Sequence, residues 1–466
     1  MARKIRAKTN LPISSLDPRK AAVDVLTEFD GTRAPIDDII DQRINRQAME
    51  SRLDRAFFNM LVYGVLRHRL RIDWIIARFS TTPVNRIKSK VLNTLRIGLF
   101  QIFFMDRVPV SAAVNTSVDI AKTHNAPWIV RYVNGLLRNI VRRSDEVEFP
   151  DIRNDPVSAI SVTKSFPRWM IKRWLVRFGQ EETIRLCDAI NTVPPTTVRI
   201  NTLTTGRVQL MEQLTDQVKS VYTCRHASTG VHFEGPSMPI DQLNAFKTGL
   251  FQVQDEAAQL VGFLVDAKPG ETIVDACCGL GGKTGHLAMQ MNNNGRILAI
   301  DNKHSRLKQL MDEMGRLGVT CVVTEKADLC NPLSPKTIKL ADRVLLDAPC
   351  SGLGVMRRNP DAKWVSEKQN MGKFQHRQMA FLDQLSGILR PGGSLVYTVC
   401  SFEPEENEQV INGFLKKHPE FVMVNPSQRS PFDSTKMIDS DGFLRTFPHI
   451  HGTDGFFAAE LQKRIR

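Results

Sequence analysis

The chain has 466 residues, of which 42% are hydrophobic and 24% charged, and this ordinary globular composition predicts two to four domains. Eight scattered cysteines exclude a disulfide framework, and no CxxC pair or Cys/His cluster has the spacing of a zinc site. No apolar run reaches the roughly 18 residues that span a bilayer, and the basic start leads into no signal region. We therefore expect a cytoplasmic protein that holds no metal and contacts no membrane. The sequence does not determine the oligomeric state, for which a monomer is the expectation.

The positive charge is concentrated in the first third of the chain. The formal net charge is +14, and residues 1–150 contain 25 Lys and Arg against 15 Asp and Glu. A basic module beside a nearly neutral remainder suggests a polyanionic partner, with nucleic acid as the first candidate. A solvated basic surface fits the charge equally well.

Helices are predicted from about residue 18 to residue 145. Apolar residues recur every three or four positions in Ala56–Leu66 and Val91–Phe104, and Pro109 and Pro127 mark turns. Asn134–Arg143 has the pattern of a closing helix, and its basic last turn suits the helix dipole. We therefore expect an all-α domain over residues 1–145.

The pattern changes after an acidic, proline-bearing linker at Asp145–Asp155. A strand is predicted at Pro194–Asn201, within a small mixed region that covers residues 146–250 together with the linker. Beyond it, β-rich runs alternate with helical patterns such as Ser305–Leu317 and Gln375–Leu389. The predicted strands of this last part are Thr272–Ala276, Arg296–Ile300, Val319–Val323, Arg343–Leu346 and Ser394–Val399. Such alternation predicts that residues 251–466 form an α/β domain around an open, mostly parallel sheet.

A glycine-rich loop, Asp275–Thr284, follows the first of these strands. Its glycines permit a tight turn and a close approach of a ligand to the backbone, and the next helix points its amides toward the same place. The loop is not a Walker motif, because Cys277 stands where the first glycine belongs. It is not a GxGxxG motif either, because Thr284 replaces the last glycine.

An acidic residue follows each of the next three strands, at Asp301, Asp328 and Asp347. Open α/β sheets bind ligands beyond the carboxyl ends of their strands, and an acid after the second strand is suited to the hydroxyls of a ribose. Each acid by itself could be a helix cap or a turn residue. Together with a loop that has no dedicated phosphate clamp, the three acids predict a nucleoside cofactor without phosphates.

Two cysteines end neighbouring strands. Cys350 follows the fourth strand and Cys400 the fifth, so both thiols should lie at one edge of the pocket. A structural cysteine or a disulfide would explain either thiol, but a pair beside a nucleoside pocket favours nucleophilic chemistry. A thiolate that adds to carbon-6 of cytosine makes carbon-5 reactive toward a sulfonium methyl group. Asp347 would stabilise the adduct at the N3/N4 edge of the base, and Lys283 would favour the thiolate. The residues leave open which of the two cysteines attacks.

At these motifs the chain resembles the Nop/Sun family of RNA cytosine-5 methyltransferases. The similar blocks are Gln254–Ala258, Asp275–Thr284, Asp347–Gly354, Val399–Asn407, Arg445–His449 and Asp454–Phe457. The first 145 residues resemble a NusB-type RNA-binding domain at Asp54–Phe58, Asp106–Pro109 and Val133–Arg138. This combination is similar to the RsmB, Sun or Fmu branch, which methylates a cytosine of 16S ribosomal RNA in bacteria. The resemblance thus implies an all-α NusB-like domain joined to an α/β Rossmann-like methyltransferase domain.

The resemblance also implies the roles of individual residues. It implies that Cys400 is the nucleophile, that Cys350 assists product release, and that S-adenosylmethionine is the cofactor. The implied cofactor contacts are Cys277, Cys278, Gly279, Leu280, Gly281, Gly282, Lys283, Asp301, Asp328 and Asp347. The chain departs from the family's Cys-Ala-Ala-Pro-Gly-Gly-Lys loop at its middle positions, and Val399 replaces a usual threonine. Neither departure removes a group that performs the chemistry.

Reaction at a ring carbon requires the target base to leave its stack. Arg357–Trp364 offers three cations and an indole, so we expect it to contact RNA, although a solvated loop has the same composition. The basic first domain is expected to add phosphate contacts, and the small mixed α/β subdomain within residues 146–250 is expected to take part in RNA recognition. Deletion of residues 1–145 is accordingly expected to weaken RNA binding and to leave cofactor binding intact.

Three other functions are consistent with parts of the pattern. The same chemistry could act on transfer RNA, because the NusB-like domain favours ribosomal RNA only by analogy. A non-catalytic RNA-binding factor is disfavoured by the intact Cys400, Cys350 and Lys283 and by Asp347. A dehydrogenase on a similar sheet is disfavoured by the failed dinucleotide fingerprint and by the cysteine pair.

Overall fold

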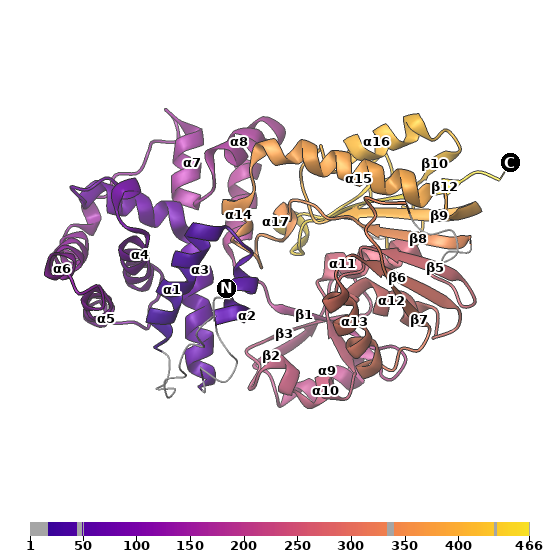
Figure 1. Cartoon of the computed structure of the whole chain (residues 1–466), viewed down its shortest axis with the longest axis horizontal. Coiled ribbons are helices and arrows are strands. Elements are labelled where there is room, and N and C mark those ends of the chain that lie inside the picture. Colours follow the sequence, from indigo (N-terminus) through magenta and orange to yellow (C-terminus); the bar gives the residue numbers. More distant parts are fainter. Residues whose placement is uncertain (1–16, 44–48, 50, 333–339, 433–435, 466) are drawn as a thin grey trace, which may run out of the picture. The chain divides into compact units, whose positions relative to one another are not determined.

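The structure is a computed structural model that describes residues 17–43, 49, 51–332, 340–432 and 436–465. The chain divides into two compact units, and Figure 1 labels most of their helices and strands. The first unit consists of Met1–Ile184 together with Asn359–Val365, and the second of Arg185–Arg358 together with Ser366–Arg466. A short segment from late in the sequence therefore belongs to the first unit.

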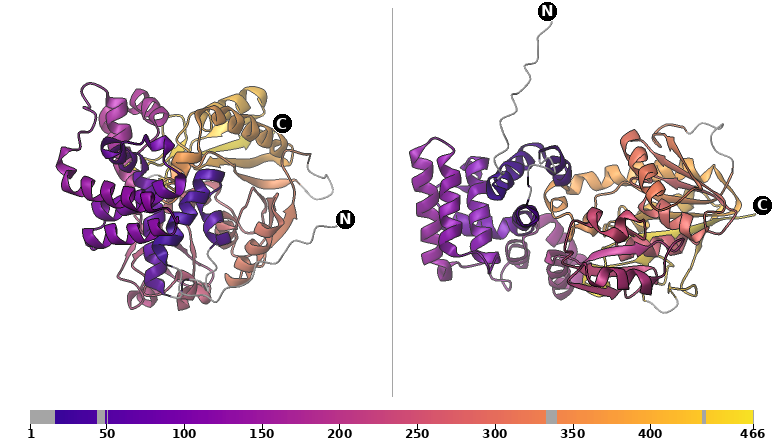
Figure 2. Two further views of the ribbon diagram at one scale, coloured as in Figure 1. Left: turned by 60° about the vertical axis from the view of Figure 1, so that its left-hand side comes forward. Right: turned by 90° about the horizontal axis from the view of Figure 1, so that it is seen from below.

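The first unit is helical. Its helices are α1 (Pro18–Thr32), α2 (Ile36–Arg43), α3 (Arg52–Phe79), α4 (Ser89–Phe104), α5 (Val110–Lys122), α6 (Pro127–Arg142), α7 (Pro156–Lys164), most of α8 (Arg168–Asn191) and α14 (Ala362–Val365). Side-chain caps begin three of them, because Asp17 accepts a hydrogen bond from Arg19 N, Ser51 accepts one from Asp54 N, and Asp155 accepts one from Ser158 N. Helices α4, α5 and α6 lie side by side and share one apolar core with α1 and α3 (Figure 2). The predicted all-α fold of the first part of the chain is confirmed.

Part of the basic excess of this unit is structural. Arg96 in α4 is 3% exposed, and its guanidinium donates hydrogen bonds of 2.8 Å to both carboxylate oxygens of Asp73. A third bond, of 3.1 Å, reaches Asp30. Removal of one partner from such a buried group leaves an uncompensated charge, which is costly. Arg96 is therefore part of the core and not of a surface for an anionic partner.

The segment Asn359–Val365 packs within the helical unit. The indole Nε1 of Trp364 donates a hydrogen bond of 2.8 Å to the carbonyl oxygen of Leu66. Lys363 is 1% exposed, and its ammonium donates to the carbonyl oxygens of Arg67 and Ser165 at 3.2 and 3.3 Å. The expectation that this segment contacts RNA is wrong for Lys363, because its charge is buried and bonded to the backbone.

Replacement of Trp364 by alanine is expected to lower the free energy of unfolding by about 2–4 kcal/mol. The indole would lose its packing against the helical core and its hydrogen bond to Leu66. Denaturant unfolding followed by circular dichroism measures the change. Trp364→Phe keeps an aromatic ring and should cost less. Trp128→Ala is the matched control at a 55% exposed side chain, and an equal loss at both positions would contradict the packing role.

The smaller sheet of the second unit is antiparallel, with the order β2-β3-β1-β4. Its strands are β1 (Thr196–Ile200), β2 (Ser220–Thr223), β3 (Gly230–Glu234) and β4 (Phe251–Val253), and α9 (Arg207–Thr215) and α10 (Asn244–Lys247) connect them along the chain. The strand predicted at Pro194–Asn201 is confirmed as β1. It is one of the two inner strands of this sheet and pairs with both β3 and β4.

The larger sheet has the order β10-β12-β9-β8-β5-β6-β7, with β11 paired to β12. Its strands are β5 (Thr272–Ala276), β6 (Arg296–Asp301), β7 (Val322–Lys326), β8 (Ala341–Asp347), β9 (Leu389–Val399), β10 (Phe421–Val424), β11 (Leu444–Arg445) and β12 (Phe457–Lys463). Strands β5 to β9 pair in parallel, whereas β12 is antiparallel to β9 and β10. The predicted open, mostly parallel sheet is confirmed. The third strand begins at Val322, after its predicted start, because Val319 N closes the end of a helix on Met314 O.

Helices cover both faces of the parallel strands. They are α11 (Glu256–Val265), α12 (Gly282–Gln290), α13 (His304–Arg316), α15 (Met371–Ser386) and α16 (Glu408–Lys417); a further short helix, α17 (Pro448–His451), precedes β12 in the chain. Ile273 and Leu345 belong to one apolar cluster, and their chain neighbours Val274 and Leu346 to another. Because side chains on both faces are buried in this way, a ligand binds at the edge of the sheet, beyond the carboxyl ends of the parallel strands. Among the helices described, none is long and apolar enough to cross a membrane.

Candidate active site

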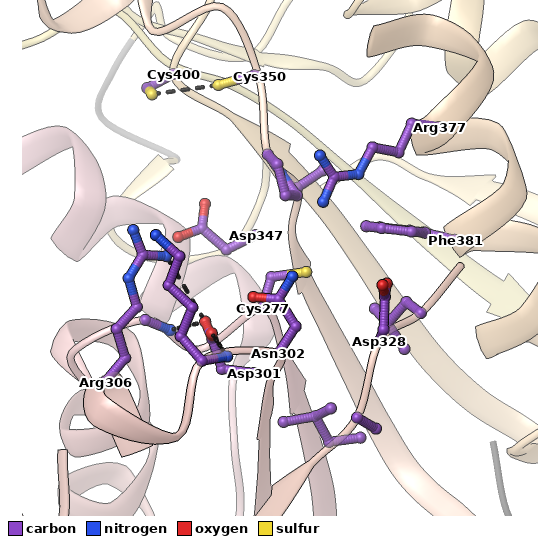
Figure 3. Close-up of a pocket in the computed structure, with 17 residues that line it drawn as sticks. Cys277, Asp301, Asn302, Arg306, Asp328, Asp347, Cys350, Arg377, Phe381 and Cys400 are labelled. Atoms are coloured by element: carbon purple, nitrogen blue, oxygen red, sulfur yellow. Dashed lines mark hydrogen bonds and ion pairs between the residues drawn. The ribbon is translucent and has the colours of Figure 1, made fainter. Parts of the chain in front are cut away.

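A cavity of about 590 Å³ lies at the carboxyl ends of the parallel strands. The predicted site residues in its lining are Cys277, Gly279, Asp301, Asp328, Asp347, Cys350 and Cys400. Figure 3 shows Cys350 and Cys400 side by side at one end, with Asp301 toward the other end and Asp347 between. The structure thus brings the ends of five strands, β5 to β9, and the polar side chains that follow them into one pocket.

Five predicted residues of the glycine-rich loop are not in the lining of the cavity, namely Cys278, Leu280, Gly281, Gly282 and Lys283. Cys278 is 8% exposed and its N–H donates to the carbonyl oxygen of Ile300, whereas Leu280 is 55% exposed. Gly281 has a φ of +83°, and a Cβ there would lie 2.7 Å from Leu310 Cγ. Only glycine fits this turn, which explains its place in the motif.

Asp301 holds the loop against the end of β6. Its Oδ2 accepts a hydrogen bond of 3.2 Å from Gly279 N, and its Oδ1 accepts one of 2.8 Å from Lys303 N. Both bonds fix the carboxylate at the wall of the cavity, where its remaining lone pairs are available to a ligand. A pinned carboxylate at this strand end suits the hydroxyls of a ribose.

Lys283 forms an ion pair with Asp347, which lines the cavity. Lys283 Nζ lies 2.7 Å from Asp347 Oδ2, and the lysine side chain is 11% exposed. Burial disfavours the ammonium, but the charge of Asp347, its hydrogen bond and the nearby Cys400 together raise the pKa of Lys283. The lysine therefore stays charged and is close enough to Cys400 to interact with it electrostatically.

The two cysteines are in contact but not bonded. Their Sγ atoms are 3.3 Å apart, which exceeds the length of about 2.05 Å of a disulfide. The hydrogen bond with Cys400 and burial raise the pKa of Cys350 well above its usual range. Cys350 therefore remains a thiol at neutral pH and can serve as a proton donor to its neighbour.

Glu406 is a site residue that sequence reasoning missed. Its Oε1 accepts a hydrogen bond of 2.8 Å from Ser351 N, and its Oε2 accepts bonds of 2.5 Å from the hydroxyls of Ser351 and Ser401. These serines directly follow Cys350 and Cys400. One buried carboxylate thus ties together the two loops that carry the thiols. The sequence shows a run of acidic residues after Cys400. It does not show which of these side chains is buried between the two loops.

Arg199 of β1 is a second residue that was missed. It is fully buried, and its guanidinium donates hydrogen bonds of 2.7 Å to Gly282 O and to the side-chain oxygen of Gln252. Burial lowers its pKa to about 9. Because Gly282 begins α12, the small sheet supports the glycine-rich loop through this arginine. No sequence motif links β1 to the loop, so only the fold reveals the contact.

The cations of Arg357 and Arg358 are also engaged within the second unit. Arg358 pairs at 2.8 Å with both Asp255 and Asp454. Arg357 is 8% exposed and donates a hydrogen bond of 2.7 Å to Gly452 O. The expectation that these arginines contact RNA is therefore corrected, because their guanidinium groups hold loops of the protein together. Arg377 and Phe381 of α15, which no motif indicated, line the cavity instead.

Three family models match the chain in succession. They are the NusB family over residues 16–142, the ferredoxin-like domain of RsmF/B-like methyltransferases over residues 166–241, and 16S rRNA methyltransferase RsmB/F over residues 263–462. The fold and the pocket are those of a Rossmann-like methyltransferase joined to a NusB-like helical domain.

Relatives match the chain over nearly its full length. It is 34% identical to the probable ribosomal RNA small subunit methyltransferase B of Synechocystis sp., over 96% of this chain and 100% of that protein. The corresponding Bacillus subtilis protein is 30% identical over 96% and 98%. The crystal structure of PH0851 superposes with a TM-score of 0.79 at 28% identity and covers 97% of this chain and 100% of that one. This chain belongs to the RsmB/F family of 16S rRNA methyltransferases.

Proposed function

We propose that this protein transfers the methyl group of S-adenosylmethionine to carbon-5 of a cytosine in 16S ribosomal RNA, through a covalent bond between Cys400 and the base. The observation that carries the proposal is the pair of sulfur atoms 3.3 Å apart in the wall of a nucleoside-sized cavity. A methyltransferase that acts on oxygen or nitrogen has no need of such a pair, because those atoms are nucleophiles themselves.

The cavity suits S-adenosylmethionine. Its volume of about 590 Å³ is within the usual range of small-molecule sites. Asp301 would accept hydrogen bonds from the ribose hydroxyls, and Gly279 lets the backbone approach the ligand closely, since a Cβ there would meet only open space. When bound, the cofactor supplies an electrophilic methyl group on a sulfonium.

Cys400 would begin the reaction as a thiolate. Attack of Sγ on carbon-6 forms a C–S bond and gives carbon-5 the electron density that it lacks in free cytosine. The ammonium of Lys283 stabilises a negative charge at Cys400, since the two groups interact. Asp347, which Lys283 holds in place, would bind the N3/N4 edge of the base.

Cys350 would complete the reaction. After the methyl transfer, carbon-5 loses its proton to a base and the C–S bond breaks, which returns the electron pair to Cys400. Cys350 retains its proton and lies 3.3 Å from Cys400, so it is placed to assist the release of this sulfur. The carboxylate of Glu406 would hold the two cysteine-bearing loops in fixed positions while the C–S bond breaks.

We propose further that the helical unit binds ribosomal RNA through its phosphates. Arg131 and Arg138 are exposed on α6. Reversal of both charges to glutamate is expected to weaken RNA binding at low salt and to lower the salt dependence by about one unit per lost contact. Filter binding over a salt series measures this effect. Deletion of residues 1–145 is a less specific test, because it also removes the partners of Lys363 and Trp364.

The function is tested with purified protein, labelled S-adenosylmethionine and three RNAs: 16S ribosomal RNA, 23S ribosomal RNA and transfer RNA. Label should enter 16S RNA alone, and nucleoside analysis should identify it as 5-methylcytidine. Label only in transfer RNA would overturn the substrate, and label on another base would overturn the chemistry. Absence of transfer to every RNA, with intact cofactor binding by calorimetry, would favour a non-catalytic RNA-binding factor.

A further inference from the structure

We propose that Cys224, His232 and Glu256 form a binding site for one Zn²⁺ ion or a chemically similar divalent transition metal. Cys224 directly follows β2, His232 lies on β3, and Glu256 is the first residue of α11. One ligand atom from each lies within 4.8 Å of the others. The sequence shows no zinc motif, because the three ligands come together only through the fold.

His232 is held in the orientation that a metal ligand requires. Its Nδ1 is 3.0 Å from Thr197 Oγ1, and Thr197 is its partner in the pairing of β1 with β3. Because Nδ1 is engaged by the hydroxyl, Nε2 is the nitrogen left to bind a metal. A hydrogen bond to the second ring nitrogen is the usual support of a metal-bound histidine.

Glu256 is oriented in the same way. Its Oε1 accepts hydrogen bonds from the N–H groups of Ala227, at 2.7 Å, and of His226. Its Oε2 lies 3.7 Å from Nε2 of His232, which is too far for a hydrogen bond. Two ligands bound tetrahedrally at about 2.1 Å from one ion are about 3.4 Å apart. A metal would therefore satisfy both atoms after a small adjustment.

Cys224 completes the set. Its thiol is buried, and a Cβ at position 230 would lie 2.5 Å from its Sγ, so Gly230 provides the space that the sulfur occupies. A thiolate and an imidazole select Zn²⁺ and similar ions over Mg²⁺ and Ca²⁺. Binding would release the thiol proton, and the thiolate and carboxylate would neutralise the ion. Three protein ligands leave the fourth position to water.

Such an ion would join the β2–β3 hairpin to the start of α11 (Figure 1). The hairpin belongs to the small sheet, whose strand β1 carries Arg199, the residue that bonds to the glycine-rich loop. The ion would thus stabilise the small sheet, which supports the glycine-rich loop of the cofactor pocket, and it would not contact the reacting atoms. Its effect should appear as increased thermal stability whether or not the protein is assayed for methyl transfer.

The test uses the full chain, stripped with a chelator and titrated with Zn²⁺ and with Co²⁺. We expect one equivalent to bind, the melting temperature to rise by several degrees, and Co²⁺ to give a thiolate charge-transfer band in the near ultraviolet. Cys224→Ser should abolish the band, whereas the matched control Cys321→Ser should retain it. Thr197→Val keeps all three ligands and should lower the affinity by about 10–100-fold.

Two results would overturn the proposal. One is the absence of a charge-transfer band in the wild type. The other is a band that survives in Cys224→Ser and disappears in Cys400→Ser, because the metal would then bind the catalytic thiols. If Cys224→Ser does not fold, His232→Gln takes its place in the test. This variant should show at most a weakened Co²⁺ charge-transfer band. An affinity for the ion equal to that of the wild type would also refute the site.

Discussion

Cys400→Ala is expected to lower methyl transfer to 16S RNA by at least about 10⁴-fold, the scale of loss seen when a covalent nucleophile is removed. Without Sγ, carbon-5 of cytosine stays too weak a nucleophile to accept the methyl group. Binding of the cofactor should be unchanged, because Cys400 lies at the end of the pocket away from Asp301. Labelled-methyl transfer and calorimetry measure the two quantities on the same preparation.

Cys350→Ala separates the two roles. If Cys350 assists release, this variant should form the bond to the base and fail to break it, which leaves a protein–RNA adduct that survives a denaturing gel. The matched control is Cys321→Ala, which should react normally and give no adduct. An adduct in Cys400→Ala and none in Cys350→Ala would mean that the two cysteines have the opposite roles.

Lys283→Met is expected to lower the rate of methyl transfer by about 10²–10³-fold, the scale for the loss of one buried electrostatic partner in an active site. The variant removes the cation beside Cys400 and leaves Asp347 without its ion pair. The acidic limb of the pH–rate profile should move to higher pH, because less positive charge is present to stabilise a thiolate. Rates measured across pH under single-turnover conditions test both statements.

The exposed Lys308 supplies the matched control, and Lys308→Met should leave the profile unchanged. Asp347→Asn, alone and combined with Lys283→Met, shows whether the loss comes from an unpaired carboxylate. If the two positions act as a pair, the double variant should lose much less than the product of the single losses. A Lys283→Met profile with the wild-type acidic limb would contradict a role of the lysine at the thiol.

The sequence by itself determined the class of fold and the neighbourhood of the reacting groups. The alternation of strands and helices predicted the parallel sheet, and the motifs at Asp275–Thr284, Cys350 and Cys400 predicted one pocket. This inference is robust because parallel neighbours end at the same edge of a sheet, whatever the details of their packing. Local motifs placed after such strands therefore meet in space, as the 3.3 Å between the two sulfurs illustrates.

Contacts between segments far apart in the chain were decided only by the tertiary structure. The sequence predicted that Lys363 contacts RNA. In the structure, its ammonium is buried and donates hydrogen bonds to backbone carbonyl oxygens of the helical unit. Arg199 and Glu406 support the pocket from positions that no spacing rule connects to it. Cys224 and Glu256 are 32 positions apart in the sequence and yet offer ligand atoms to one ion. Composition and motifs report which groups are present. Whether a charge is solvated, paired or buried depends on side-chain packing, which has no local signature.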